Sequence, residues 1–288
     1  MQSTSLKRLL PIAVAAVSTL GPLSAQALAV SPPGDLSTWN CVGICATSAA
    51  DGDITLSPQA NARYGYVATS GSTVYGASPL ALDANSRGSG TETNGSRVVS
   101  GSFHANTSDR LDIHFNYVST DGKGYDDYAW ARLLNAADDS LVAWLYTARS
   151  SNSNTKGIVP GDVVSKHEFD PDAMIVDYKD FEFHSKTASD PVDWSPLGWS
   201  NGSCWKDNAA GCGYTGWLQS SYAFAGSGNF KVEIGVVNWG DEAFDSGLAF
   251  DFAHLSAPVP EPATSHLMLA ALTLFGFLGH RRLAVARR

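Results

Sequence analysis

The stretch "RLDIHFNYV" at residues 110–118 alternates polar and apolar side chains from its first position to Tyr117. The odd positions from 111 to 117 are Leu, Ile, Phe and Tyr, and the even positions are Arg, Asp, His and Asn. A period of two is the period of a β-strand, whose successive side chains point to opposite faces. We therefore expect a strand with one face in a core and one face in water, with His114 on the wet face.

The same period of two occurs in two other stretches, "NFKVEIGVV" (229–237) and "GLAFDFAHL" (247–255). The segment "SLVAWLYTA" (140–148) is apolar on both faces, so we expect it to be covered on both sides. "MIVDYKDFEF" (174–183) changes parity between Tyr178 and Phe181, which predicts a β-bulge near Lys179 and Asp180. Shorter candidate strands are 54–56, 64–69, 98–103, 128–134 and 218–224.

The chain thus contains about ten candidate strands, separated by turns rich in Gly, Asn and Asp. Helical periodicity is almost absent from the sequence. The pattern predicts an all-β fold, and the simplest arrangement is one antiparallel β-sandwich of jelly-roll type over residues 30–257. A closed β-barrel is the alternative. An outer-membrane barrel is not favoured, because the apolar faces are no larger than a core requires.

The two ends differ from this body. At the N-terminus Lys7 and Arg8 precede an apolar run and small residues up to Ala27 and Ala29, which predicts a signal peptide over 1–29 rather than a buried first helix. At the C-terminus residues 263–279 carry no ionised side chain, and a cluster of four arginines follows. This order predicts a transmembrane helix at about 263–280 whose basic end lies in the cytoplasm. A permanent single-span anchor is one interpretation of that helix.

Charge restricts the partners of the body. The chain has 19 Lys and Arg against 28 Asp and Glu, and the terminal segments hold six of the basic residues and one acidic residue. The remainder has 13 basic and 27 acidic residues, a net charge of −14. This balance argues against a nucleic-acid partner or an anionic membrane surface, because there is no basic patch to attract phosphate.

All four cysteines, Cys41, Cys45, Cys204 and Cys212, lie in the part predicted to be exported. An even count in an oxidising compartment predicts two disulfides, for which three connectivities are possible. The close spacings favour Cys41–Cys45 and Cys204–Cys212. A zinc site is the competing interpretation, but the C-x2-C spacing typical of such sites is absent.

Acidic residues concentrate in two loops that could hold calcium. Asp121, Asp126 and Asp127 crowd one turn, and Asp241, Glu242, Asp245 and Asp251 crowd the last hairpin. Calcium takes six to eight oxygen ligands, and two neighbouring acidic loops could supply them. The alternative, which we favour, is that these side chains cap tight turns by bonding to backbone.

A second candidate site is rich in aromatic residues. Trp194, Trp199, Trp205, Tyr214 and Trp217 fall within 24 residues, around the predicted Cys204–Cys212 loop. Their rings could stack on sugars and form a glycan-binding surface. The alternative, which we favour, is that they form a small core under a disulfide-bonded loop.

Catalytic motifs are missing from the sequence. The exported part has five histidines (His104, His114, His167, His184, His254), and none belongs to an H-E-x-x-H motif. There is no G-x-S-x-G elbow, P-loop or dinucleotide fingerprint. Glu168 and the many Asp residues could be paired as in a glycosidase, but no spacing requires it. We therefore expect no enzyme and no catalytic residue.

The C-terminal tail closely resembles a known sorting signal. Val259, Pro260, Glu261, Pro262 and Ala263, followed by an apolar span and an Arg-rich end, are similar to the PEP-CTERM signal of Gram-negative bacteria that make exopolysaccharide. The resemblance covers residues 258–288. It implies recognition by a membrane-embedded exosortase, cleavage near the Pro-Glu-Pro triplet, and only transient anchoring in the inner membrane. Signal peptidase would process the other end.

The body is similar to jelly-roll ectodomains attached to such tails. The similarity lies in "FNYVSTDGKGYDDYAWARLL" (115–134) and "GNFKVEIGVVNWGDEAFDSGLAFDFAHL" (228–255). Together the two resemblances imply an exported, non-enzymatic surface or matrix protein associated with exopolysaccharide or biofilm. The alternatives are a carbohydrate-binding module that uses loop 194–217 and a polysaccharide hydrolase or lyase.

Overall fold

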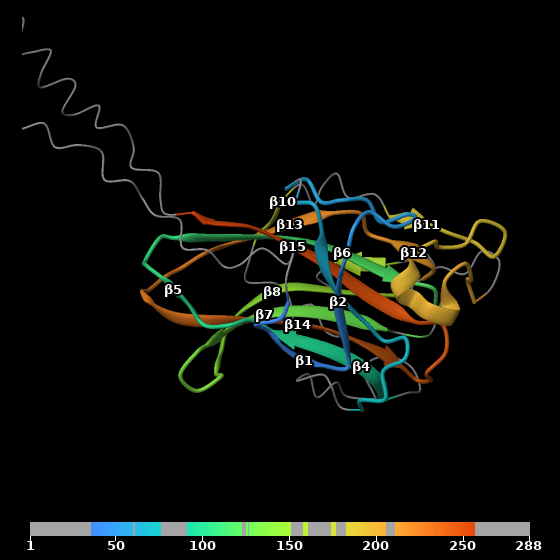
Figure 1. Ribbon diagram of the computed structural model, residues 1–288, viewed down its shortest axis with the longest axis horizontal. Helices are drawn as coiled ribbons and strands as arrows, with labels where there is room; N and C mark the ends of the chain where they lie inside the picture. The colour runs from blue at the N-terminus through green and yellow to red at the C-terminus, as the bar shows by residue number, and fades with distance from the viewer. Residues whose placement is uncertain are drawn as a thin grey trace, which may run out of the picture.

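Two antiparallel β-sheets packed face to face make up the body of the protein (Figure 1). The computed structural model describes residues 36–59, 61–75, 91–122, 125, 127–150, 158–160, 174–176, 183–205 and 211–256. The predicted signal peptide, the predicted bulge near Lys179 and Asp180, and the tail from residue 257 lie outside these ranges. The fold is thus a β-sandwich of two separate sheets, as expected, while its jelly-roll type stays a prediction.

The first sheet, sheet A, has the strand order β1-β4-β14-β7-β8-β9, and β5 also pairs with β14. Its strands are β1 (Asn40–Val42), β4 (Glu92–Val99), β5 (Phe103–Ala105), β7 (Tyr128–Asn135), β8 (Leu141–Ser150), β9 (Ile158–Pro160) and β14 (Gly228–Trp239). The alternating segment 229–237 and the segments 128–134 and 140–148 are therefore strands of one sheet, as predicted. Strands β4 and β7 flank β14 on either side.

The second sheet, sheet B, has the order β10-β13-β6-β15-β3-β2, with β12 joining β11 to β6. Its strands are β2 (Ile44–Ser48), β3 (Tyr64–Ala68), β6 (Arg110–Ser119), β10 (Met174–Val176), β11 (His184–Ser185), β12 (Gly213–Tyr214), β13 (Leu218–Ala223) and β15 (Ser246–Ser256). The opening stretch forms β6, which lies in the middle of this sheet between β13 and β15. The segments 64–69, 218–224 and 247–255 are also strands, as predicted.

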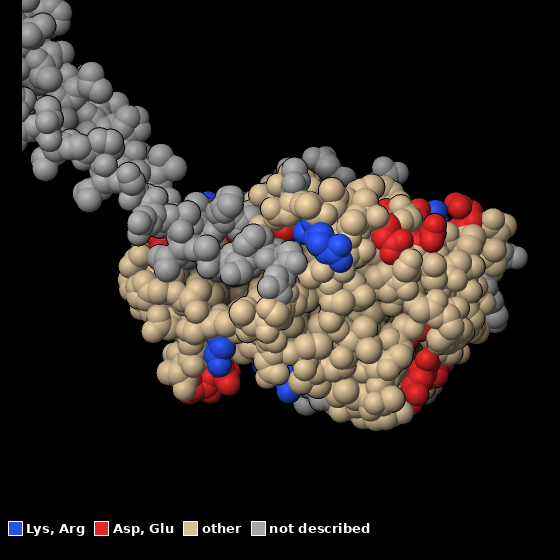
Figure 2. Space-filling view, viewed as in Figure 1, with Lys and Arg blue, Asp and Glu red and all other residues tan. Residues whose placement is uncertain are grey.

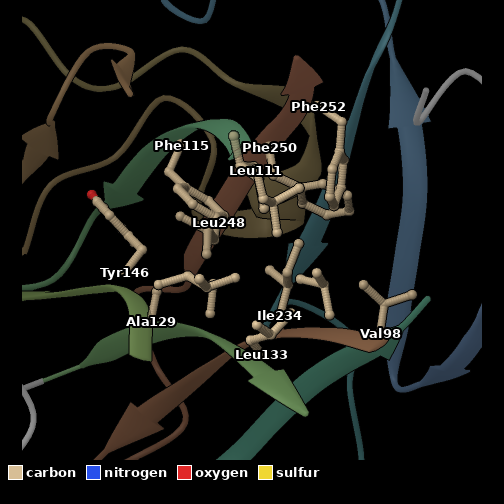
Figure 3. Packing of buried hydrophobic residues seen from close by; sticks show 14 of the residues in the cluster. Val98, Leu111, Phe115, Ala129, Leu133, Tyr146, Ile234, Leu248, Phe250 and Phe252 are labelled. Atoms are coloured by element: carbon tan, nitrogen blue, oxygen red, sulfur yellow. The ribbon is translucent and has the colours of Figure 1, made fainter. Parts of the chain in front are cut away.

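The main core fills the space between the two sheets (Figure 3). The predicted apolar face of β6 points into it, and Leu111, Ile113, Phe115 and Tyr117 are all buried. Phe115 of sheet B stacks on Tyr146 of sheet A with 4.7 Å between ring centroids. Each fully buried Leu or Phe contributes about 1.5–3 kcal/mol, so this layer supplies most of the driving force for folding.

Sheet B is covered on its outer face as well, and the small core predicted as the alternative role of the tryptophan-rich segment is part of this covering. A second core of Ile54, Tyr64, Val118, Val192, Trp194, Leu197, Cys204, Cys212 and Ala249 lies between this sheet and two loops. The loops are tied together by backbone bonds such as Asp53 N to Asp193 O, 2.7 Å. The expectation that β6 has a wet outer face is therefore correct only for Arg110, which is exposed, and Asp112, which is half-buried; from His114 to Val118 this face is buried. His114 is 4 % exposed instead of solvated.

Two shorter strand predictions need correction. Segment 54–56 contributes only an isolated bridge between Asp51 and Ile54, because it belongs to the covering loop. Segment 98–103 is split between the end of β4 and the start of β5. The first half of β4 was missed because Asn94 and Ser96 are polar, yet both are buried. Their side chains donate to the carbonyl oxygens of Thr69 and Ala68, at 3.0 and 2.6 Å, which offsets the cost of burial.

Both disulfides have the predicted pairing. Cys41–Cys45 and Cys204–Cys212 bridge Cα atoms that lie 6.0 and 5.7 Å apart. The first spans the corner at which the chain leaves β1 of sheet A and enters β2 of sheet B. Gly43 makes this corner possible, since its φ is +88° and a Cβ would lie 2.3 Å from Ser96 Oγ.

Candidate functional site

Trp194, the first residue of the predicted glycan-binding set, is a core residue. It is 0 % exposed, and its indole N–H donates to the Tyr64 hydroxyl over 2.9 Å. It lies so close to β15 that a Cβ on Gly247 would be 2.5 Å from its ring. The 3-10 helix η2 (Ser195–Ser200) begins directly after it. Trp194 therefore holds η2 against sheet B.

The other aromatic residues of the segment lie progressively closer to the surface. Trp217 is partly buried, and its indole N–H donates to the Thr55 carbonyl over 3.0 Å. Tyr214 stacks on His184 at 4.6 Å, and Trp205 contacts Tyr125 at 5.4 Å. Trp199 is 62 % exposed on η2. The segment thus supplies a second core and leaves one ring, Trp199, open to solvent.

Two of the predicted calcium ligands, Asp127 and Asp245, are buried in a hydrogen-bonded network at the β14–β15 turn. Asp127 accepts hydrogen bonds from the Trp239 backbone N–H at 2.8 Å and from the Ser246 hydroxyl at 2.6 Å. Asp245 accepts from the Thr69 hydroxyl at 2.9 Å and the Ser200 hydroxyl at 2.8 Å. Burial raises the pKa of Asp127 to about 8.

The remaining predicted ligands do not converge on these two. Asp121 accepts from the Gly122 N–H at 2.6 Å, and Asp241 accepts from the Ala243 N–H at 2.8 Å, as turn caps do. Glu242 accepts from the Tyr75 hydroxyl. Asp251 lies on the outer face of sheet B, where Asn61 donates to it over 2.8 Å. Asp126 lies outside the described residues, and among those residues no group of three or more acidic, His or Cys side chains could hold a metal.

The histidines that the structure describes are held by structural contacts. His114 lies across the strand pair from Asp251, and burial lowers the pKa of His114 and raises the pKa of Asp251. His104 is exposed, with its Nδ1 3.1 Å from the side-chain oxygen of Asn229. His184 is occupied by the stack on Tyr214. His167 and Glu168 lie outside the described residues, as does the side chain of His254.

Sequence reasoning missed a charged cluster on the outer face of sheet A. Glu233 of β14 is 3 % exposed and lies between two arginines from neighbouring strands. Its Oε1 accepts from Arg132 Nε at 2.8 Å and from the Trp130 indole N–H at 3.2 Å. Arg97 Nη1 approaches Oε2 at 3.6 Å. One buried carboxylate thus orients two guanidinium groups.

The alternation in 229–237 does place Lys231 and Glu233 on the outer face of a strand. What the sequence cannot provide is the pairing of β14 with β4 and β7, which brings in Arg97 and Arg132. A second cluster on the same face was missed for the same reason. It contains Tyr128, Trp130, Trp144, Val237 and Trp239.

Comparison with known proteins adds the C-terminal tail to this description. No curated protein matches the chain. The family model of the PEP-CTERM protein-sorting motif matches residues 258–282 and therefore includes the five predicted motif residues from Val259 to Ala263. The chain thus carries the sorting motif that is typical of exported surface proteins sorted by an exosortase. It is a PEP-CTERM protein with a β-sandwich body.

The sorting motif itself and the predicted transmembrane segment lie outside the described residues. Within the ranges that the structure describes, no helix has the length and hydrophobicity needed to cross a bilayer. The last strand, β15, ends at Ser256, two residues before the match begins. The sandwich therefore leads into the sorting motif with almost no linker.

Proposed function

We propose that this protein is a non-enzymatic surface or matrix protein of a Gram-negative bacterium, associated with exopolysaccharide or biofilm. Signal peptidase removes residues 1–29, the tail holds the protein in the inner membrane, and exosortase then cuts near Pro260–Pro262. The mature β-sandwich remains at the cell surface or outside the cell. The observation that carries this proposal is the sorting motif at 258–282.

The position of the motif supports the order of events. It follows β15, whose pairing with both β6 and β3 places it inside sheet B. Removal of the tail after Ser256 therefore takes away no strand of the described sandwich. Cleavage can release the body without unfolding it, because both cores lie within residues 36–256.

The placement of the titratable groups supports a non-enzymatic role. A general acid or base must reach a substrate atom within about 3 Å or through one water. Asp127, Asp245 and Asp251 are 0–1 % exposed and hydrogen-bonded inside the protein. His114 is equally enclosed, with 4 % exposure. These side chains stabilise loops and strands, so we assign them no catalytic role.

The test compares cells with and without their exosortase. In cells that have the enzyme, the exported protein should lack Arg288 by intact mass, whereas in cells without it the uncut chain should stay in the membrane fraction. A Pro260→Ala, Glu261→Ala, Pro262→Ala variant should behave like the deletion. A control variant with His254→Ala and Leu255→Ala, next to the native Ala253, keeps the motif and should still be cut. Identical masses in both strains would overturn the proposal.

The alternative is a carbohydrate-binding role for the segment 194–217. Trp199 supports it, since this ring is 62 % exposed and lies against Phe244 with 5.9 Å between centroids. Glycan-array binding that is lost in Trp199→Ala would favour this function. Release of reducing ends or unsaturated products from exopolysaccharide would instead favour a hydrolase or lyase.

A further inference from the structure

The outer face of sheet A has a hollow that is lined by the charged cluster around Glu233. We propose that this hollow, which we call the arginine groove, binds carboxylate groups of an acidic polysaccharide. Its lining includes Thr38, Asn40, Arg97, Arg132, Lys231 and Glu233. The groove lies on the sheet opposite to the one that carries η2 and the tryptophan-rich segment.

The size and shape of the groove suit an extended ligand. Its volume is about 340 Å³, within the range of roughly 300–1,000 Å³ typical of ligand sites. A second hollow of about 420 Å³ adjoins it through Lys231 and is lined by Asn135 and Asn229. The two hollows meet at Lys231, and the second reaches the turn after β7, so that a chain of several sugars could occupy both.

The charge of the groove differs in sign from that of the domain. Three cationic side chains line it, against the carboxylates of Glu233 and Asp139, which leaves a net charge of +1. The chain as a whole carries −9. Acidic side chains gather at the end of the molecule near β11 and β12, and a smaller acidic group lies at the turn between β7 and β8, beside the groove, where Asp139 pairs with Lys231 (Figure 2). An anion is therefore attracted to this groove and repelled by much of the remaining surface.

Arg97 is oriented but keeps its hydrogen-bonding capacity. Its side chain is 38 % exposed, and its ion pair with Glu233, at 3.6 Å, is too long for a hydrogen bond. Among the described residues it makes no other side-chain hydrogen bond. A guanidinium carries five N–H donors in a fork that matches the two oxygens of a carboxylate. Arg97 is therefore prepared to accept a carboxylate from solution.

The neighbouring polar groups favour a saccharide over an acidic peptide. Thr38 and Asn40 are exposed at the rim, and Asn135 uses its side-chain oxygen to accept from the Ala137 N–H at 3.0 Å. Such groups can pair with sugar hydroxyls. A peptide would also need partners for its backbone, but the backbone of β4, β14 and β7 is already paired within the sheet.

This site deepens the proposed surface function and rests on it for the presence of extracellular polysaccharide. Its own test uses the exported protein, purified from the extracellular fraction, with polygalacturonate as the probe. Loss of binding would leave the exosortase experiment unaffected, so the two can fail separately. Raising salt from about 0.1 M to about 1 M shortens the screening length from about 10 Å to about 3 Å and should weaken binding.

The variant Arg97→Gln should weaken binding to polygalacturonate by about tenfold or more, since charge-assisted hydrogen bonds are lost. Arg97→Lys keeps the charge without the fork and should show an intermediate loss. The matched control is Arg110→Gln on sheet B. Arg110 has 48 % side-chain exposure and a 3.6 Å ion pair with Asp112, so its charge and exposure resemble those of Arg97, although its Nε also donates to the Ser221 hydroxyl at 2.6 Å. The Arg110→Gln variant should bind polygalacturonate with the same affinity as the unchanged protein.

Three results would overturn the proposal. Equal affinity of the Arg97 and Arg110 variants would exclude the groove as the site. Equal affinity for carboxyl-reduced polygalacturonate or neutral dextran would exclude carboxylate recognition. Tighter binding of poly-glutamate than of polygalacturonate would exclude a saccharide. Circular dichroism of each variant separates a loss of binding from a loss of fold, and Lys231→Gln gives a second, independent variant of the same groove.

Discussion

Replacement of Asp127 by Asn should remove the contribution of this carboxyl group to the pH dependence of the free energy of unfolding. Asp127 is fully buried at the start of β7, and burial raises its pKa from 3.8 to about 8. This pKa is the net result of desolvation, which raises it most, of hydrogen bonds from Ser246 and Trp239, which lower it, and of the carboxylates of Asp241 and Asp245, which add a smaller rise. Between pH 4 and pH 8 the folded protein therefore keeps a proton on this group that the unfolded chain has released.

The sign of the effect follows from this difference in bound protons. Because the folded state has the higher pKa, the stability from this group is complete below about pH 4 and is lost as pH rises toward 8. The pKa of Asp127 is about four units higher in the folded state than in the unfolded chain. At about 1.36 kcal/mol per unit, this corresponds to a loss of about 6 kcal/mol of stability between pH 4 and pH 8. Between pH 5 and pH 7 the loss is about 3 kcal/mol.

The Asn side chain can replace the protonated carboxyl without a change of shape. Its oxygen can accept from the Trp239 N–H, and its amide can donate to the Ser246 hydroxyl. The free energy of unfolding is measured with urea at pH 5 and at pH 7. Its decrease between these two pH values should be about 3 kcal/mol smaller in Asp127→Asn than in the unchanged protein. The variant should be the more stable protein at pH 7.

The matched control is Asp138→Asn. Asp138 also accepts from one backbone N–H and one hydroxyl, both of Ser140, but it is exposed and these bonds hold its pKa below the usual range. Asp138→Asn should therefore show the same change in the free energy of unfolding between pH 5 and pH 7 as the unchanged protein. Equal pH dependence in the unchanged protein and Asp127→Asn would refute the assignment of a proton to Asp127.

Three further predictions follow from packing and from the acidic loops. Gly235→Ala should lower the free energy of unfolding by about 1–3 kcal/mol, because the new Cβ would lie 2.1 Å from the buried ring of Trp130; Gly101→Ala, with no atom within 4 Å of its Cβ, should be neutral in the same urea titration. Trp194→Ala should cost about 3–5 kcal/mol, whereas Trp199→Ala should change the stability by about 0.5 kcal/mol or less; equal costs would contradict the second core. Calorimetry in calcium and in EDTA should give the same melting temperature, since protein donors already occupy the described carboxylates, and a rise of several degrees with calcium would instead indicate an ion site.

The positions of strands could be predicted from the sequence where polar and apolar residues alternate with a period of two. The alternation in 110–118 identified β6 and its core residues, because a period of two has one physical explanation. The buried half of β4 could not be found in this way, since Asn94 and Ser96 are polar and become tolerable only through distant acceptors. The small core under the disulfide-bonded loop was predicted from its aromatic residues, but the contribution of the loop at 51–57 to the outer covering of sheet B was missed because that loop has no period. Local pairs, such as the two disulfides, were predicted from spacing alone.

The aromatic-rich segment shows why composition is a weak guide to a site. A cluster of tryptophans satisfies the requirements of a sugar platform and of a core equally well, and only burial separates the two. Here Trp194 is fully enclosed and Trp217 and Tyr214 are partly so. The arginine groove has the opposite property. Its residues look ordinary in sequence, since they are separated along the chain, and only strand pairing brings them together.

The arginine groove and the strand that precedes the sorting motif lie on different layers of the sandwich. The sorting motif begins two residues after β15 of sheet B, whereas the arginine groove is on the outer face of sheet A. The main core separates these layers, and no residue that lines the groove belongs to β15. Cleavage of the tail therefore removes no residue that lines the groove. For this reason we expect the anchored and the released forms to bind an acidic polysaccharide with the same affinity, so that binding can begin before sorting is complete.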